Sequence, residues 1–389
     1  MKFTSYDNWE QYKEFFMEQF PIEESYVICG VGGGYHALIG LFPEIKVRYC
    51  LDAAVQETCA KGGEVYPYKA LLGRDVQMQK FIITAGGVYY SEIKNTLLFY
   101  GVQEENICSL PEILFFWGIR YRGKVFAASC NVILLTHCNL RCKSCSQLVP
   151  YVKNYHYSSA EKVKSDLDRY FHVFDYVKEL VLVGGETFLY KDLAEVARYI
   201  KGHFPDRYYE LKVFTNGTIV PNESVIESLS ELDRVRVWIS DYTCSIKREH
   251  STIIKYLEKY KVPYTLNNSF GQSAENRWFD LGDPFALKAG DAVSRFRYCS
   301  LVTPSLWDHK IYYCAPSCGA ALGDILPSDS TQVCLDLALL ERMEPSEQAE
   351  RIGKFSLGFL DKGYLEFCRF CNGFGTDVNQ KFIQAGEQC

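Results

Sequence analysis

The stretch Thr136-His-Cys138-Asn-Leu-Arg-Cys142-Lys-Ser-Cys145 decides how this sequence of 389 residues is interpreted. It directly follows an apolar run, residues 131–135, that has the length of a buried strand. The spacing C-x3-C-x2-C places three cysteines on one short loop, with no fourth cysteine nearby in the sequence. A structural zinc site takes four protein ligands, whereas three thiolates leave one iron of a [4Fe–4S] cube open. The loop therefore indicates an iron–sulfur site at the end of a strand.

The whole chain contains 16 cysteines in an otherwise ordinary, mildly acidic composition. With 48 Asp and Glu against 42 Lys and Arg, the net charge is −6, which argues against a nucleic-acid partner. The sequence shows no secretory signal and no apolar run long enough for a membrane span, so we expect a cytoplasmic protein without a membrane partner. Because disulfides rarely persist in that compartment, several cysteines are expected to bind metal.

Outward from the loop, the periodicity predicts an α/β protein of three parts. Residues 1–120 read as a Rossmann-like α/β domain, residues 121–290 as a partial barrel of alternating strands and helices, and residues 291–389 as a small metal-stapled domain. The barrel strands are expected at residues 131–135, 180–183, 211–214, 234–240 and 264–267.

The N-terminal part carries a glycine-rich turn between a predicted strand and a predicted helix. Gly30, Gly32 and Gly33 would let the backbone approach a ligand phosphate at the start of the helix. Asp52 lies near where a ribose-binding acid is expected, but Tyr35 and His36 occupy the place of the third glycine of the dinucleotide fingerprint. The pattern indicates a Rossmann-like fold. It leaves three alternatives for this domain: it binds a nucleotide sugar, it binds a carrier, or it binds no small molecule.

Three more motifs follow predicted strands, in a fixed order after the cysteine loop. They are Gly184-Gly185-Glu186, Thr215-Asn216-Gly217 and Ser240-Asp241. With the cysteine loop they resemble the radical S-adenosylmethionine (radical SAM) superfamily, which implies a partial (β/α)6 barrel.

In that family the glycine–glutamate turn holds the methionine amino group, and the other two turns line the SAM cleft, with the serine near the ribose. Two departures concern the packing of adenine: Ser144 replaces a usual aromatic residue, and Thr187 replaces a usual proline.

A second set of cysteines lies in the C-terminal part: Cys299, Cys314, Cys368 and Cys371. Their spacing resembles the twitch domain, the short relative of SPASM domains, and implies an auxiliary [4Fe–4S] cluster used in electron transfer. His309 stands where that pattern often has glycine. A four-thiolate zinc site is the alternative, and Cys318 is an alternative ligand beside Cys314.

By resemblance, the protein generates a 5′-deoxyadenosyl radical that removes hydrogen from a substrate, with flavodoxin or ferredoxin as reductant. The glycine-loop domain favours a sugar, nucleotide sugar or aminocyclitol that is dehydrogenated, deoxygenated or epimerised; the closest functional model is the radical SAM dehydrogenase acting on 2-deoxy-scyllo-inosamine. Cys244 and Cys318 are candidate hydrogen-atom donors. The alternatives are a peptide-modifying radical SAM enzyme, although no winged-helix leader-binding domain is seen, and a non-catalytic iron–sulfur protein.

Overall fold

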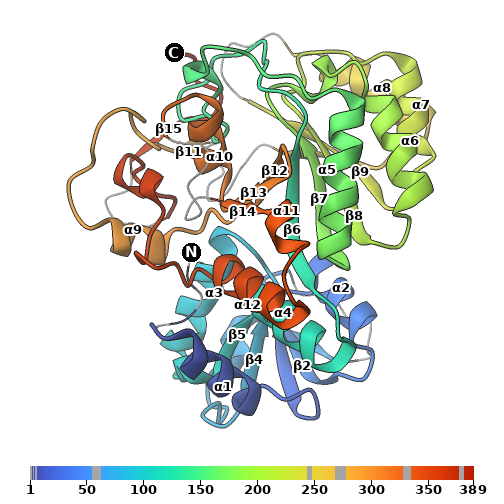
Figure 1. The fold of residues 1–389 in the computed structure, drawn as a ribbon. Coiled ribbons are helices and arrows are strands. Elements are labelled where there is room, and N and C mark those ends of the chain that lie inside the picture. Colours follow the sequence, from blue (N-terminus) through green and yellow to red (C-terminus); the bar gives the residue numbers. More distant parts are fainter. Residues whose placement is uncertain are drawn as a thin grey trace.

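The structure, a computed structural model, describes residues 2, 4, 7–54, 63–242, 248–267, 277–326, 334–375 and 381–389. It is a mixed α/β protein with two main parallel sheets, one formed by the N-terminal part and one by the centre of the chain (Figure 1). In the described part of the chain, no helix is both long enough and apolar enough to cross a membrane.

The N-terminal sheet has five parallel strands in the order β3-β2-β1-β4-β5. Its strand β1 is buried along nearly its whole length, as its run of apolar residues predicts. The strands are β1 (Ser25–Cys29), β2 (Lys46–Leu51), β3 (Val65–Tyr66), β4 (Lys80–Ile83) and β5 (Ile107–Ser109), and the helices are α1 (Trp9–Gln19), α2 (Gly33–Leu41), α3 (Val88–Phe99) and α4 (Leu110–Trp117). This parallel strand order is the arrangement expected of a Rossmann-like domain.

The central sheet begins with five parallel strands that are neighbours in chain order, β6 to β10. Helices α5 to α8 cover one face of it (Figure 1). The strands are β6 (Phe126–Ile133), β7 (Tyr176–Val183), β8 (Tyr208–Thr215), β9 (Val235–Ser240) and β10 (Tyr264–Asn267), and the helices are α5 (Ala160–Val173), α6 (Leu193–His203), α7 (Glu223–Ser230) and α8 (His250–Lys259). The carboxyl ends of these strands therefore meet at one edge, where the predicted motifs lie.

The C-terminal part continues the central sheet instead of forming a layer of its own. Strand β12 (Ser305–Trp307) pairs in parallel with β6, and β13 (Lys310–Tyr312) and β14 (Cys334–Asp336) extend the sheet in antiparallel fashion. A sixth barrel strand next to β10 is not present among the described residues, since β11 (Arg277–Phe279) pairs with β15 (Phe382–Gln384). The remaining helices are α9 (Ala292–Tyr298), α10 (Ala315–Leu322), α11 (Leu337–Leu340) and α12 (Pro345–Ser356).

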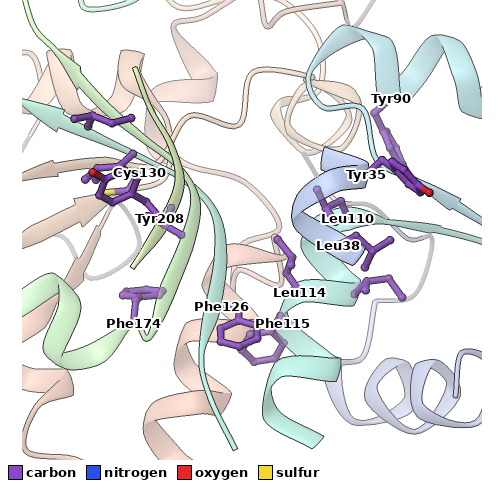
Figure 2. Packing of buried hydrophobic residues seen from close by; sticks show 14 of the residues in the cluster. Tyr35, Leu38, Tyr90, Leu110, Leu114, Phe115, Phe126, Cys130, Phe174 and Tyr208 are labelled. Atoms are coloured by element: carbon purple, nitrogen blue, oxygen red, sulfur yellow. The ribbon is translucent and has the colours of Figure 1, made fainter. Parts of the chain in front are cut away.

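One continuous hydrophobic core joins the two sheets. Phe126 lies at the start of β6. The centroid of its ring is 6.1 Å from that of Phe42 in the N-terminal part and 5.9 Å from that of Tyr176 on β7. Figure 2 shows Phe115 of α4 and Phe126 of β6 with Leu38 and Leu110 on one side and Phe174 and Tyr208 on the other. Helix α12 also packs on the N-terminal part, because a Cβ on Gly353 would lie 2.5 Å from the Phe115 ring and 2.6 Å from that of Trp9.

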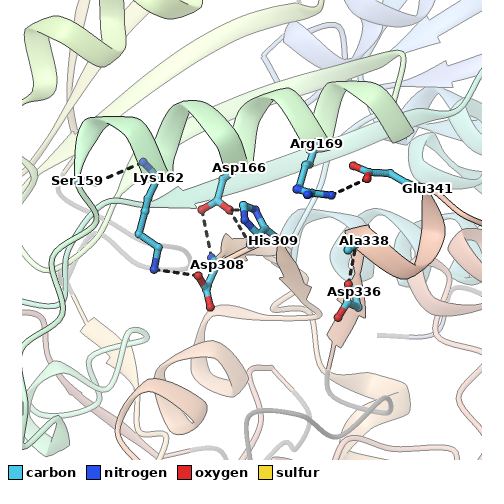
Figure 3. Close-up of polar contacts among 9 residues, drawn as sticks. All are labelled: Ser159, Lys162, Asp166, Arg169, Asp308, His309, Asp336, Ala338 and Glu341. Carbon is cyan, nitrogen blue, oxygen red and sulfur yellow. Dashed lines mark hydrogen bonds and ion pairs between the residues drawn. The ribbon is translucent and has the colours of Figure 1, made fainter.

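The turn between β12 and β13 is fastened to α5 by a buried carboxylate (Figure 3). Asp308 and His309 form a two-residue hairpin loop with φ values of 50° and 61°, a conformation that favours glycine. Asp166 on α5 accepts the amides of His309 at 2.6 Å and Asp308 at 3.2 Å, and its carboxylate lies 2.8 Å from Nδ1 of His309. These contacts explain how histidine is held at the position where the family pattern often has glycine.

Candidate active site

The cysteine loop leaves the carboxyl end of β6 and is held against the turn that follows β7. The amide of Gly185 donates to the carbonyl of Leu135 at 2.8 Å, and the amide of Glu186 donates to the carbonyl of His137 at 3.0 Å. The amide of Thr136 also donates to the carbonyl of His156 at 2.9 Å. The first residues of the loop are therefore fixed by the backbone on both sides.

Gly184 and Gly185 are required by this close approach of two backbones. A Cβ on Gly184 would lie 2.3 Å from the carbonyl oxygen of Leu135, and one on Gly185 would lie 2.1 Å from that of His137. No side chain fits in so little space. The neighbouring backbone therefore requires both glycines, independently of any ligand.

Glu186 joins the turn after β7 to the turn after β8. Its side chain is buried, and its Oε1 accepts the amide of Phe188 at 2.9 Å and the hydroxyl of Thr215 at 2.7 Å. Its Oε2 accepts the amide of Asn216 at 2.7 Å. Burial raises the pKa of Glu186 to about 7, although these three donors oppose the shift.

Asn216 connects the turn after β8 to the cysteine loop. Its Nδ2 donates to Oδ1 of Asn139 at 3.0 Å and lies 3.6 Å from Sγ of Cys138. Asn139 in turn donates to the hydroxyl of Thr218 at 2.7 Å. The structure thus brings together the cysteine loop and two of the three predicted turns through direct hydrogen bonds.

Ser240 and Asp241 end β9 at the same edge of the sheet. Ser240 is buried, while Asp241 forms an ion pair with Arg248 at 2.5 Å. Nδ1 of His250 lies 3.7 Å from the same carboxylate oxygen, and its Nε2 would lie 2.2 Å from a Cβ on Gly217. Burial lowers the pKa of His250. Nothing in the sequence pattern pointed to this histidine.

The aromatic residues at this site are not at position 144, where the family usually has one, but at positions 242 and 278. Tyr242 follows the Ser240-Asp241 turn, hydrogen-bonds to Ser240, and packs edge-on against Trp278 with ring centroids 5.3 Å apart. Ser144 instead has a φ of 52°, and its hydroxyl contacts the carboxylate of Asp280 at 3.0 Å. A tyrosine directly after a predicted SAM-cleft turn was the signal that could have identified this ring.

The three loop thiols offer the donor set that a cluster with one open iron requires. Burial raises the pKa of Cys138 to about 12 and also raises that of Cys145, while Cys142 is buried. The amide of Leu140 donates to Sγ of Cys138 at 3.4 Å, and Nε2 of Gln388 donates to Sγ of Cys142 at 3.1 Å. N–H donors directed at sulfur are typical of cysteines that hold iron–sulfur clusters, so these residues fit the group.

The four C-terminal cysteines surround a second site. Cys299, Cys314, Cys368 and Cys371 line one pocket, whose other walls are mostly apolar. No three His, Cys, Asp or Glu side chains in the described ranges lie close enough to ligate a single metal ion.

The two candidate hydrogen donors have different outcomes. Cys318 is fully buried on α10 among apolar residues that include Ile133 and Trp307, and it does not line the four-cysteine cavity. Its position therefore does not support it as an alternative ligand, and it has no exposed surface for a substrate. Cys244 lies outside the described residues.

The glycine turn of the N-terminal part has a tighter structure than a simple ligand loop. Both oxygens of Asp52 are engaged, one by the amide of Val31 at 2.8 Å and the other by the amide of Ala54 at 2.8 Å, so this carboxylate braces the loop. Gly30 has a φ of 95°, and a Cβ on Gly34 would lie 2.2 Å from the carbonyl oxygen of Thr84. Gly34 therefore supplies the close helix–strand packing for which the sequence argument found no third glycine.

The surroundings of Gly32 and Gly33 show which part of the central sheet lies next to this turn. Nothing lies within 4 Å of a Cβ on Gly32, whereas one on Gly33 would meet Tyr209 at 3.4 Å and Lys178 at 3.9 Å. The turn thus faces the first residues of β7 and β8.

Comparison with known proteins supports the assignment of the central sheet. Residues 132–261 match the family model described as the radical SAM superfamily. A Methanocaldococcus jannaschii protein described as a glycyl-radical enzyme activating enzyme is 33% identical over 99 residues, which cover 25% of this chain and 36% of that protein. The chain thus spans little more than a third of the curated relative it matches.

The solved structures matched by this chain have low sequence identity and TM-scores below 0.5. BtrN in complex with AdoMet and 2-DOIA has a TM-score of 0.41 and 16% identity, covering 68% of this chain and 98% of BtrN. anSMEcpe with bound AdoMet has a TM-score of 0.39 and 13% identity, covering 67% and 93%. Streptococcus suis SuiB bound to S-adenosylmethionine has a TM-score of 0.33 and 13% identity, covering 48% and 46%.

Proposed function

Because residues 132–261 match the radical SAM family model, we propose that this protein is a radical SAM enzyme that binds a [4Fe–4S] cluster through Cys138, Cys142 and Cys145. The observation that carries the proposal is the hydrogen bonding of the cysteine loop to the turns after β7 and β8. When bound, the cluster supplies the electron that splits SAM into methionine and a 5′-deoxyadenosyl radical, which removes a hydrogen atom from the substrate.

The residues of this chain orient SAM beside the open iron. Oε2 of Glu186 accepts one hydrogen bond, from Asn216, so it retains a lone pair for the methionine ammonium group. The positive charge of that group favours the ionised carboxylate, whose pKa burial alone has raised. Ser240 and Asp241 lie at the same edge, where they would meet the ribose.

We assign the four-cysteine cavity to an auxiliary [4Fe–4S] cluster that takes part in electron transfer. Four thiolates saturate the irons, so a substrate would not ligate this cluster. Dehydrogenation of an alcohol leaves a substrate radical that must lose one more electron, and a fully ligated cluster suits that step. A zinc ion in the same place would be redox-inactive.

The barrel wall supports a small polar substrate. Leu211 and Val213 of β8 are fully buried, so the alternating residues Lys212 and Phe214 lie on the opposite face of the strand from them. Lys212 is buried and pairs with Glu179 at 2.9 Å and with Glu210 at 3.5 Å.

Burial opposes ionisation of Glu179, but Lys178 and Lys212 outweigh it and hold its pKa below the usual range. Next to this network, the ring of Trp238 stacks on Phe214 with centroids 5.7 Å apart, and its indole N–H is buried without a partner among the described residues. A charged wall beside an aromatic face suits a polyhydroxylated ring. This wall favours a sugar, nucleotide sugar or aminocyclitol as the substrate.

The first experiment tests the enzyme class. The reconstituted protein is incubated anaerobically with SAM and dithionite, and we expect 5′-deoxyadenosine and methionine in equal amounts. The Cys142→Ala variant should form neither. The absence of 5′-deoxyadenosine from the reconstituted wild-type protein under every condition would overturn the proposal and favour a non-catalytic iron–sulfur protein.

The second experiment tests the substrate and the auxiliary cluster. Deuterated nucleotide sugars and aminocyclitols should transfer deuterium into 5′-deoxyadenosine, whereas transfer only from peptides would favour a peptide-modifying enzyme. Iron analysis should give about eight irons per chain and about four in the Cys368→Ala/Cys371→Ala variant. Four irons with one zinc per chain would refute the auxiliary cluster.

A further inference from the structure

The segment of residues 384–389 runs along the cysteine loop, although the residues in contact are more than 240 positions apart in the sequence. Cys142 and Gln388 form an antiparallel bridge. The amide of Lys143 donates to the carbonyl of Glu387 at 2.6 Å, and the amide of Cys389 donates to the carbonyl of Arg141 at 2.8 Å. An ion pair of 2.5 Å between Lys143 and Glu387 adds to these backbone contacts.

Gln388 has one possible orientation in this arrangement. Its Oε1 accepts the amide of Arg141 at 2.7 Å, and because a backbone N–H can only donate, the atom facing it must be the oxygen. The NH₂ group therefore faces the other way, where Nε2 donates to the carbonyl of Gly386 at 2.6 Å and to Sγ of Cys142 at 3.1 Å. Both protons of the amide are used, which fixes the donor on the sulfur.

The distance of 3.1 Å between Nε2 of Gln388 and Sγ of Cys142 is shorter than three other N···S distances at the proposed cluster cysteines. The amide of Leu140 lies 3.4 Å from Sγ of Cys138, Nδ2 of Asn216 lies 3.6 Å from the same atom, and the amide of Gly373 lies 3.4 Å from Sγ of Cys371. A donor stabilises a cluster sulfur more when an added electron makes that sulfur more negative.

We propose that Gln388 is a positioning residue that raises the reduction potential of the SAM-binding cluster by donating a hydrogen bond to the Cys142 thiolate. The inference rests on the proposed function, because it requires a cluster on Cys138, Cys142 and Cys145. The segment of residues 384–389 holds the Gln388 amide in place through its backbone contacts with residues 141–143.

The test is a potentiometric titration of the reconstituted protein, monitored by electron paramagnetic resonance. The signal that changes when SAM is added identifies the cluster with the open iron. In Gln388→Met, which keeps the length of the side chain but cannot donate, we expect a potential more negative than that of the wild type. A tenfold change in the reduction equilibrium corresponds to about 59 mV for a one-electron couple.

Glu387→Gln is the matched control in the same segment. It breaks the ion pair with Lys143 and removes one negative charge, so its potential should stay the same or become less negative. If both variants shift to more negative values, docking of the segment, and not the hydrogen bond, sets the potential, and the proposal is overturned.

Should Gln388→Met lose iron, Gln388→Glu retains the acceptor for the Arg141 amide and replaces the donor by an anionic oxygen. Its potential should be more negative than that of the wild type. An unchanged potential in an iron-replete Gln388 variant would refute this inference alone, whereas absence of a SAM-sensitive signal in the wild type would refute the proposed function.

Discussion

Replacing Gly185 by alanine tests the tightest backbone contact in the active site. The new Cβ would lie 2.1 Å from the carbonyl oxygen of His137 and 2.9 Å from the amide nitrogen of Cys138. Relief of the first contact requires the cysteine loop to move by about 1 Å, and misplacement by that distance can reduce a rate about 100-fold. We therefore expect the variant to form 5′-deoxyadenosine about 100-fold more slowly and to be less stable by about 1–3 kcal/mol.

The assay measures 5′-deoxyadenosine anaerobically with saturating SAM, together with the iron content and the free energy of unfolding in urea. Gly202→Ala is the control, because a Cβ on Gly202 of α6 meets nothing within 4 Å. That variant should keep wild-type activity and gain up to about 1 kcal/mol from the better helix propensity of alanine. Wild-type turnover and stability in Gly185→Ala would show that the backbone contact does not position the loop.

Three further predictions concern the proposed auxiliary cluster, the contacts of Asp166 with the turn between β12 and β13, and the buried side chain of Glu186. Cys314→Ala should lose about half of the bound iron while Cys318→Ala keeps all of it, and equal losses on iron analysis would contradict the assigned ligands. Asp166→Ala leaves two backbone amides without their acceptor and should lower the free energy of unfolding by about 2–4 kcal/mol. His309→Gly suits the positive φ and should lower it by less than about 1 kcal/mol. The reverse order in urea titrations would be evidence that Asp166 does not hold the turn. Burial raises the pKa of Glu186 to about 7. As the pH rises from about 4.5 to 7, the cluster-free protein should therefore lose about 3 kcal/mol of its free energy of unfolding relative to Glu186→Gln, with no further loss at higher pH. A stability difference between the two proteins that does not change with pH would refute burial as the cause.

The α/β class and the meeting of the motifs could be predicted because both follow from local rules. Apolar runs predict buried strands, and parallel strands bring their carboxyl ends to one edge, so motifs that follow successive strands must converge. The contacts of Glu186 with Thr215 and Asn216 are consistent with that reasoning. Residues 132–261, which match the family model, contain these motifs one after another along the chain.

The interpretation missed contacts between residues that are far apart in the sequence. Gln388 has no recognisable spacing relative to Cys142, and the pairing of β12 with β6 depends on how the C-terminal part folds back. Asp52 was assigned to a ligand by its distance from the glycine turn, but spacing cannot show that two nearby amides, those of Val31 and Ala54, already occupy its oxygens.

The docking of residues 384–389 on the cysteine loop has a consequence for biosynthesis. A ribosome that has made Cys145 must add more than 200 residues before Gln388 exists, which takes about 10–50 s at the usual rates of elongation. During that interval the nascent chain displays the cysteine loop without the segment that lies against it. Delivery of iron and sulfide before residues 384–389 have been made would therefore reach a loop that lacks this partner, so maturation after the segment has docked is the order that this topology favours.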